Sequence, residues 1–455
     1  MLTQEVNDRY TLVGPGTPTG ELMRRYWHPI AAVSQLNDIS TKKIRLLGED
    51  LILYKDRSGT FGLIEPHCAH RRMNLIYGIP EEHGLRCPYH GWMYDETGQC
   101  IEQPYEETED PDARFKDKIK MKAYPVEQKA GLIFAYLGPA PAPLVPNWDV
   151  FAADDVIRDI GYAELPCSWL QCQENSLDPV HLEWLHVGWA NYIAEMRGEP
   201  DNVRPHRRHS RIGFDRFEYG IYKRRIMEGG SEEDTSWREG HPIVFPYFLR
   251  QGGSGIHRDH WSTMGPSFQI RVPIDDTHTG HWWVMCHPKL ESDPEQRPED
   301  VPFFEPPVVE LDEEGQPRWS ILDTNSAQDV AAWITQGPIA DRTGENLGRS
   351  DKGIIMFRQM LEENIRIVED GGDPMNTFRD PAANVYHGMD TELPRELAAA
   401  RTKGDTGGTG TRMATGNAGF KRQGAASKFS PILSARGLEG GVDAAERRKE
   451  LERKT

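Results

Sequence analysis

Residues 68–75 read CAHRRMNL, and residues 87–100 read CPYHGWMYDETGQC. These two stretches contain four side chains that bind metals well: Cys68, His70, Cys87 and His90. Two thiolates and two imidazoles on two short loops can hold one zinc ion, or a two-iron cluster with cysteines on one iron and histidines on the other. A zinc site usually takes its thiolates as a CxxC pair, whereas one Cys and one His in each loop favour the two-iron cluster. Ordinary buried cysteines and solvated histidines remain a third interpretation.

The residues around these positions resemble the Rieske family, through CAHRRMNL in the first loop and CPYHGWMYDETGQC in the second. Rieske proteins of respiratory complexes carry an extra cysteine in each loop, and this sequence has none there, so the resemblance is to the oxygenase branch. It implies a [2Fe-2S] cluster held by Cys68, His70, Cys87 and His90 in an N-terminal all-β domain. Neutral imidazoles in place of two thiolates raise the potential of such a cluster, which then accepts electrons readily.

The composition limits what else the chain can do. Its 455 residues carry a net charge of −18, which disfavours nucleic acids and anionic membranes as partners. We find no N-terminal export signal and no apolar run long enough to span a bilayer, so we expect a cytoplasmic protein. The cysteines outside the motif are expected to be small buried hydrophobic residues: Cys100, Cys167, Cys172 and Cys286.

The pattern along the chain predicts two domains and a tail, with an α+β fold overall. Alternating runs and turns over residues 42–65 predict successive antiparallel hairpins, and residues 131–139 read as a closing strand. The proline-rich segment that follows reads as a linker, so we place a Rieske domain at residues 1–146.

The remainder mixes strand-like and helical runs, which indicates an α+β catalytic domain over residues 147–396. Strands are expected within residues 213–224, 267–272 and 281–287, and an amphipathic helix over residues 352–370. Residues 397–455 are rich in Gly, Thr and charge, and we expect a disordered tail with a short helix near residues 442–453.

A second candidate metal site lies in ENSLDPVHLEWLH, residues 174–186. Two histidines and a carboxylate form the facial triad that binds non-heme Fe(II) and leaves positions open for oxygen. On a straight helix His181 and His186 would lie roughly 140° apart, so sharing one metal requires a local bulge or break. Pro179 makes an irregular backbone plausible, although a purely structural histidine pair stays open. The segment resembles the mononuclear iron motif of the ring-hydroxylating oxygenases.

The third iron ligand implied by this resemblance is Asp329 in SAQDVAAWITQG, which we expect in the first turn of a helix. The residues from Ser326 to Asp329 also fit a capping box, which is the alternative reading. Asp323 and Asp341 are rival ligands.

Asp178 and Asn175 are the remaining catalytic candidates. In the resembled family the aspartate at this position joins the cluster histidine of one subunit to the iron histidine of a neighbour. That match assigns Asp178 to electron transfer between His90 or His70 and His181, and it implies an oligomer. An ordinary carboxylate at a helix N-terminus is the alternative.

The resemblance extends through most of residues 1–390, is closest to the phthalate dioxygenase-like group, and implies a helix-grip fold for the catalytic domain. It predicts an oxygenase that uses O2 for cis-dihydroxylation or a monooxygenation such as O-demethylation of an aromatic, carboxylated substrate. It further implies a homotrimer and a flavin and iron-sulfur reductase that supplies electrons from NAD(P)H. The alternatives are a Rieske-type electron carrier, a zinc hydrolase and a non-catalytic binding protein.

Arginine suits a planar carboxylate best, so arginines are the candidates for substrate binding. We select Arg207 and Arg250 from four that lie in polar segments; the other two are Arg208 and Arg258. Solvated loops would explain the same segments, and the nearby histidines read as surface residues: His206, His209, His257 and His260.

Overall fold

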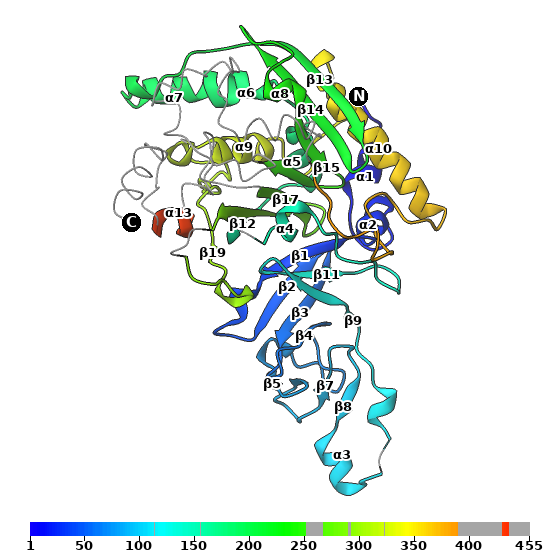
Figure 1. Cartoon of the computed structure of the whole chain (residues 1–455). Coiled ribbons are helices and arrows are strands. Elements are labelled where there is room, and N and C mark those ends of the chain that lie inside the picture. The colour runs from blue at the N-terminus through cyan, green and yellow to red at the C-terminus, as the bar shows by residue number, and fades with distance from the viewer. Residues whose placement is uncertain are drawn as a thin grey trace.

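A computed structural model describes residues 1–112, 114–154, 156–251, 267–289, 293–322, 324–389 and 430–435. Three antiparallel sheets occupy the N-terminal part, in the orders β1-β11-β10, β2-β3-β4-β9 and β5-β6-β7-β8 (Figure 1). Their strands are β1 (Trp27–Ala32), β2 (Thr41–Leu46), β3 (Glu49–Lys55), β4 (Phe61–Ile64), β5 (Ile79–Glu81), β6 (Gly84–Arg86), β7 (Met93–Tyr94), β8 (Cys100–Glu102), β9 (Ala123–Tyr124), β10 (Val126–Lys129) and β11 (Leu132–Tyr136).

The second part is built on an eight-stranded sheet in the order β13-β14-β15-β16-β17-β18-β12-β19. Its strands are β12 (Val156–Leu165), β13 (His209–Phe217), β14 (Gly220–Met227), β15 (His241–Val244), β16 (Phe248–Gln251), β17 (Ser267–Pro273), β18 (Thr279–Pro288) and β19 (Phe303–Phe304). All pairs are antiparallel except β12 with β19.

Helices flank these sheets and lie mostly on the large one (Figure 1). They are α1 (Gln4–Thr11), α2 (Pro18–Met23), α3 (Pro104–Glu109), α4 (Asp149–Ala152), α5 (Trp169–Ser176), α6 (His181–Glu183), α7 (Ala190–Met196), α8 (Thr235–Arg238), α9 (Asn325–Ile334), α10 (Lys352–Glu369) and α13 (Pro431–Ala435). The predicted α+β fold is confirmed, with small antiparallel sheets and the short helices α1, α2 and α3 in the N-terminal part.

Several local expectations are met for identifiable reasons. The hairpin of β2 and β3 turns at Leu47 and Gly48, and both have positive φ, as a two-residue hairpin turn requires. The amphipathic helix expected over residues 352–370 is α10, and Phe357 and Leu361 lie on its buried face. Ile355 is 41% exposed and lies outside that face.

One expected strand is two strands in the structure. Residues 213–224 contain the end of β13 and the start of β14, which pair with each other through a tight connection after Phe217. The sequence pattern missed the turn because Glu218 and Tyr219 carry no glycine or proline signal.

The proline-rich segment after β11 is held against the C-terminal part of the described chain. The Trp27 indole donates to the Pro143 carbonyl at 2.8 Å, and Leu144 forms an isolated bridge with Phe378. One hydrophobic core also includes residues from both parts, among them Phe134 and Phe268. The boundary near residue 146 stays a prediction.

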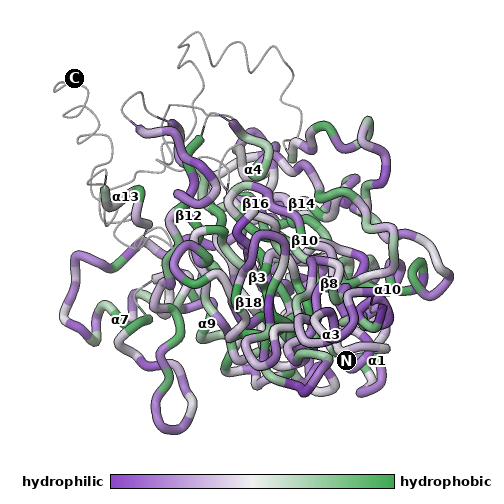
Figure 2. Tube along the Cα trace, turned by 90° about the horizontal axis from the view of Figure 1, so that it is seen from below, coloured by the Kyte–Doolittle hydropathy of each residue, from purple (hydrophilic) through white to green (hydrophobic). Residues whose placement is uncertain are grey.

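Apolar residues concentrate inside the sheets, whereas the outer loops are mostly hydrophilic (Figure 2). The four cysteines outside the motif are buried and free, as expected. The described part of the chain contains no helix that is both long and apolar enough to cross a membrane. Residues 397–429 and 436–455, with the expected helix near residues 442–453, lie outside the described residues.

Candidate metal centres

The backbone of the histidine segment is irregular where the sequence required it. The short helix α6 continues directly into a π-helix, η4 (Trp184–Trp189). A π-turn closes its hydrogen bond over five residues, so side chains five apart are brought toward the same side. The ring centroids of His181 and His186 are consequently 5.1 Å apart. The predicted local bulge is confirmed, and no straight helix joins the two histidines.

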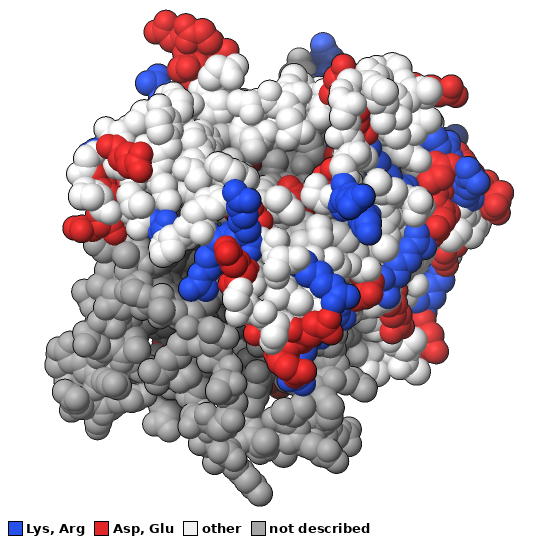
Figure 3. All heavy atoms as spheres, turned by 90° about the horizontal axis from the view of Figure 1, so that it is seen from above, with Lys and Arg blue, Asp and Glu red and all other residues white. Residues whose placement is uncertain are grey.

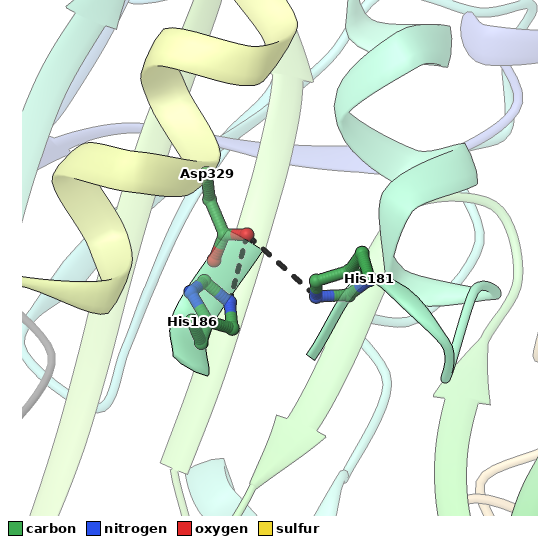
Figure 4. A group of neighbouring side chains, drawn as sticks. All are labelled: His181, His186 and Asp329. Atoms are coloured by element: carbon green, nitrogen blue, oxygen red, sulfur yellow. Dashed lines mark ion pairs between the residues drawn. The ribbon is translucent and has the colours of Figure 1, made fainter. Parts of the chain in front are cut away.

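Asp329 completes a compact group with these histidines (Figure 4). Its Oδ1 lies 3.2 Å from His186 Nε2 and 3.7 Å from His181 Nε2. One ligand atom from each of the three residues lies within 4.8 Å of the others. The donor set of two imidazoles and one carboxylate fits an Fe(II) site of the facial-triad type.

The position of Asp329 within α9 differs from the first-turn position that we expected. Thr324 caps the helix by accepting a hydrogen bond from the Ala327 N–H at 3.2 Å, so Asp329 lies in the second turn. The capping-box alternative is therefore wrong: the cap is Thr324, and the Asp329 carboxylate is free to face the histidines. Of the rivals, Asp341 is exposed and accepts bonds from Thr343, while Asp323 lies outside the described residues.

Neighbouring polar groups fix the orientation of the triad. Gln328 Oε1 lies 3.0 Å from His186 Nδ1, which leaves the Nε2 atom directed at Asp329. Asn175 donates from Nδ2 to Asp329 Oδ1 at 3.4 Å. Such outer contacts set the tautomer and the ring orientation of a metal-binding histidine. The sequence pattern did not single out Gln328, although this residue directly precedes Asp329.

The electrostatics of the triad favour charged side chains. Burial alone lowers the pKa of His186, but the Asp329 carboxylate and Gln328 raise it above its ordinary value. Burial likewise opposes ionisation of Asp329, and the adjacent His186 and His181 nevertheless lower its pKa. A divalent cation would replace the proton shared in this group, because metal ligands must be deprotonated.

Asp178 lies beside the triad but outside it. Its Oδ2 is 3.6 Å from His181 Nδ1, and its Oδ1 accepts a hydrogen bond from the Val180 N–H at 2.7 Å. Side-chain exposure is 26%, so the carboxylate is reachable from the surface next to a triad histidine.

The four residues of the first motif meet in two neighbouring loops. Cys68 and Cys87 are buried, with 1% and 2% exposure, whereas His70 and His90 are exposed and their ring centroids lie 4.4 Å apart. Each loop is closed by backbone bonds, from Cys68 N–H to the Met73 carbonyl and from Cys87 N–H to the Trp92 carbonyl.

This arrangement separates a buried thiolate pair from an exposed imidazole pair. Among the residues that the structure describes, only the triad gathers three or more metal-binding atoms within 4.8 Å. A single zinc ion needs one compact cage, so the spread of the four ligands fits a two-iron cluster better. The Tyr94 hydroxyl lies 3.1 Å from Cys68 Sγ and adds a hydrogen bond at the sulfur end.

The two selected arginines have different surroundings. Arg207 is exposed in the loop before β13. Arg250 is buried in an ion pair with Asp149 of α4 at 2.8 Å, and its strand partner Phe268 faces α4 as well. Because its guanidinium is already neutralised there, the geometry does not favour Arg250 for substrate binding. Arg258, His257 and His260 lie outside the described residues.

Comparison with known proteins places these sites in a family. A model of the Rieske [2Fe-2S] domain matches residues 26–125, and a model described as LigXa C-terminal domain like matches residues 318–389, which include Asp329. The chain is 43% identical to a 5,5'-dehydrodivanillate O-demethylase oxygenase subunit from Sphingobium, over 84% of this chain and 85% of that protein. It is 29% identical to a phthalate 4,5-dioxygenase oxygenase subunit from Pseudomonas putida, over 83% and 89%.

Solved structures show the same fold. NdmA from Pseudomonas putida CBB5 superposes with a TM-score of 0.56 at 20% identity, covering 80% of this chain and 97% of that one. The oxygenase of carbazole 1,9a-dioxygenase, solved with its ferredoxin, gives 0.54 at 18% identity, covering 84% and 97%. The relatives favour an oxygenase over a simple electron carrier. The chain belongs to the Rieske non-heme iron oxygenases, as an alpha or oxygenase subunit.

Proposed function

We propose that this subunit catalyses the O-demethylation of a carboxylated aromatic ether, with electrons from a separate reductase. The convergence of His181, His186 and Asp329 supports the oxygen chemistry. The choice of O-demethylation rests on the 43% identity to a 5,5'-dehydrodivanillate O-demethylase subunit. Hydroxylation of the ring is the second candidate, supported by the phthalate 4,5-dioxygenase relative.

The residues assigned to each group follow from the geometry. Cys68, His70, Cys87 and His90 would hold the [2Fe-2S] cluster, and the triad would hold Fe(II). When bound, the cluster supplies single electrons and the mononuclear iron supplies a site for O2. Gln328 keeps the His186 ring oriented, and Asn175 restrains the Asp329 carboxylate.

Asp178 is proposed to carry electrons between subunits. The cluster loops lie near β5 and β7 at one end of the chain, and α6 lies at the other end (Figure 1). A short electron path therefore requires the cluster of a second copy, as in the homotrimer that the family resemblance implies. Asp178 is suited to the junction because it is partly exposed and lies 3.6 Å from His181.

The proposed reaction is balanced with one O2 and two electrons. One oxygen atom is inserted into a C–H bond of the methoxy group, and the resulting hemiacetal loses formaldehyde to leave a phenol. The other oxygen atom leaves as water, which consumes two protons and the two electrons that NAD(P)H gives to the reductase.

The test is a turnover assay of the iron-loaded protein with a flavin and iron-sulfur reductase and NADH. Methoxylated benzoates and biphenyl carboxylates are offered, and O2 uptake, formaldehyde and product mass are measured. Formaldehyde equal to the O2 consumed supports O-demethylation. A diol that retains both atoms of labelled O2 would support ring dihydroxylation instead, and a reducible cluster without substrate-dependent O2 uptake would support the electron carrier.

A further inference from the structure

Three cationic side chains lie on the face of the large sheet that carries the iron site. Cross-strand partners lie on the same face, and the row Ile221, Ile243, Leu249 and Gln269 runs from β14 to β17. Residues an even number of positions apart on one strand share a face. On β14, Lys223 and Arg225 lie two and four positions after Ile221, and on β17 Arg271 lies two positions after Gln269. All three side chains therefore lie on the face of this row. We call these three residues the cationic wall.

Helices α5 and α9 cover this face. Trp283, the partner of Gln269, packs in one cluster with Cys172 of α5 and Trp333 of α9. The Arg271 guanidinium lies 5.9 Å from the centre of the Trp333 ring. Since α9 also presents Asp329, the cationic wall and the iron triad lie on the same side of the sheet, and the Asp329 carboxylate acts electrostatically on both Lys223 and Arg271.

No described carboxylate forms an ion pair with the cationic wall, although Asp329 acts on Arg271 and Lys223 from a greater distance. Arg271 is 1% exposed, and its only side-chain hydrogen bond in this part of the chain goes to the neutral Gln269 Oε1 at 2.9 Å. Its Nε and Nη1 atoms are buried without partners there. Lys223 is 6% exposed, and the carboxylates that act on it, Asp178 and Asp329, belong to the metal site.

The other arginines that are buried in the described part of the chain are paired with carboxylates. Glu174 of α5 bonds Arg342 at 2.7 Å and Arg358 at 2.7 Å, and Asp149 pairs with Arg250. On the outer surface, too, acidic and basic side chains are interspersed on the visible face (Figure 3). Unpaired buried cations are costly, so the buried Lys223 and Arg271 beside the iron triad indicate a missing anion.

The pKa shifts of two of these side chains are those expected when a bound anion is missing. Burial lowers the pKa of Lys223 to about 7, and Arg225 contributes to this shift. Burial also lowers the pKa of Arg271 to about 10. A bound anion would offset both effects, because it stabilises the charged forms.

We propose that the cationic wall, chiefly through the Arg271 guanidinium, binds the carboxylate of the aromatic substrate and so selects acids over neutral analogues. Trp333 and Trp283 provide aromatic surface beside it. The Nε and Nη1 atoms of Arg271 have no hydrogen-bond partner among the described residues, and a guanidinium matches a planar carboxylate in shape. A carboxylate bound there would direct the aromatic ring of the substrate toward the triad. This inference rests on the proposed function, because it names the group that the same site recognises.

The test uses binding, so that it does not depend on turnover. The iron-loaded protein is titrated with 4-hydroxy-3-methoxybenzoate and with the matching benzamide, and tryptophan fluorescence or calorimetry gives both Kd values. The wild type should bind the acid about 10- to 100-fold more tightly than the amide, as expected for hydrogen bonds to a charged group. Arg271→Gln should remove most of this preference, and Lys223→Gln part of it.

Arg224 provides a matched control on the same strand. It points to the opposite face of β14 and pairs with Asp215. Arg224→Gln should keep the preference for the acid. Thermal melting and the visible spectrum of the cluster verify that each variant is folded and loaded.

Two results would overturn the inference. One is a wild type that binds acid and amide equally, or binds neither. The other is a folded Arg271→Gln variant with the full wild-type preference. Selective acid binding without any formaldehyde or diol would contradict the proposed function and leave the cationic wall in place.

Discussion

The cluster loops and the iron triad are assembled by opposite means. The cluster loops bring their cysteines and histidines from two short segments, each closed by its own backbone hydrogen bonds. The triad takes His181 from α6, His186 from a π-helix and Asp329 from α9, far later in the chain. Local ligands form a recognisable motif, whereas ligands from separate elements depend on how the helices pack. Each site should therefore fail without damaging the other.

The largest expected effect comes from removing the carboxylate of the triad. Asp329→Ala should lower substrate-dependent O2 uptake by roughly 1000-fold, because the mononuclear iron loses its only anionic protein ligand. Iron content should fall from three toward two per chain while the visible spectrum of the cluster stays unchanged. Asp341→Ala, at the exposed rival position, is the control and should keep both. Full iron and turnover in Asp329→Ala would reject Asp329 as a ligand.

Asp178→Asn should disconnect the two metal centres and leave both in place. Oxygenation should fall by about 100-fold, since contacts of this kind orient metal-binding histidines. Reduction of the cluster by the reductase should stay normal, and its reoxidation by substrate and O2 should become slow in rapid-mixing experiments. The native mass should equal that of the wild type. A wild-type rate of reoxidation would exclude Asp178 from the electron path.

Gln328→Ala should weaken the triad less severely. The His186 ring loses the acceptor that orients it, and we expect a 10- to 100-fold loss of affinity for Fe(II), the usual range for outer contacts. Excess Fe(II) should restore turnover, which separates this variant from Asp329→Ala. Activity that iron does not rescue would mean that Gln328 supports the fold and not the metal.

The smallest effect is expected at the cluster. Tyr94→Phe removes the hydroxyl 3.1 Å from Cys68 Sγ, and a hydrogen bond of about 1 kcal/mol corresponds to a decrease of about 40 mV in a one-electron potential. Protein-film voltammetry measures this shift. Tyr54→Phe is a matched control in the same core, because its buried hydroxyl has no partner among the described residues. Equal potentials in both variants would exclude a role for Tyr94.

Much of the fold follows from local pattern. The hairpins of residues 42–65 and the amphipathic helix of residues 352–370 were predictable because turn residues and apolar spacing act over a few positions. The turn after Phe217 was missed, since Glu218 and Tyr219 are not typical turn residues and the single Gly220 that follows them is a weak signal. The bend between His181 and His186 was predictable as a geometric need, but its form as a π-helix was not.

The sequence by itself determined the metal-binding residue types and the two histidine positions, because their spacing is local. Only the tertiary structure decided which carboxylate joins them, since Asp329 reaches the histidines through the packing of α9. It also decided which arginine lies on the sheet face that α5 and α9 cover. Side chains alternate between the faces of a strand, so Arg250 faces α4 while Arg271 faces Trp333 of α9, the helix that carries Asp329. The face on which each arginine lies is set by the pairing register of the whole sheet, which no short stretch of sequence encodes.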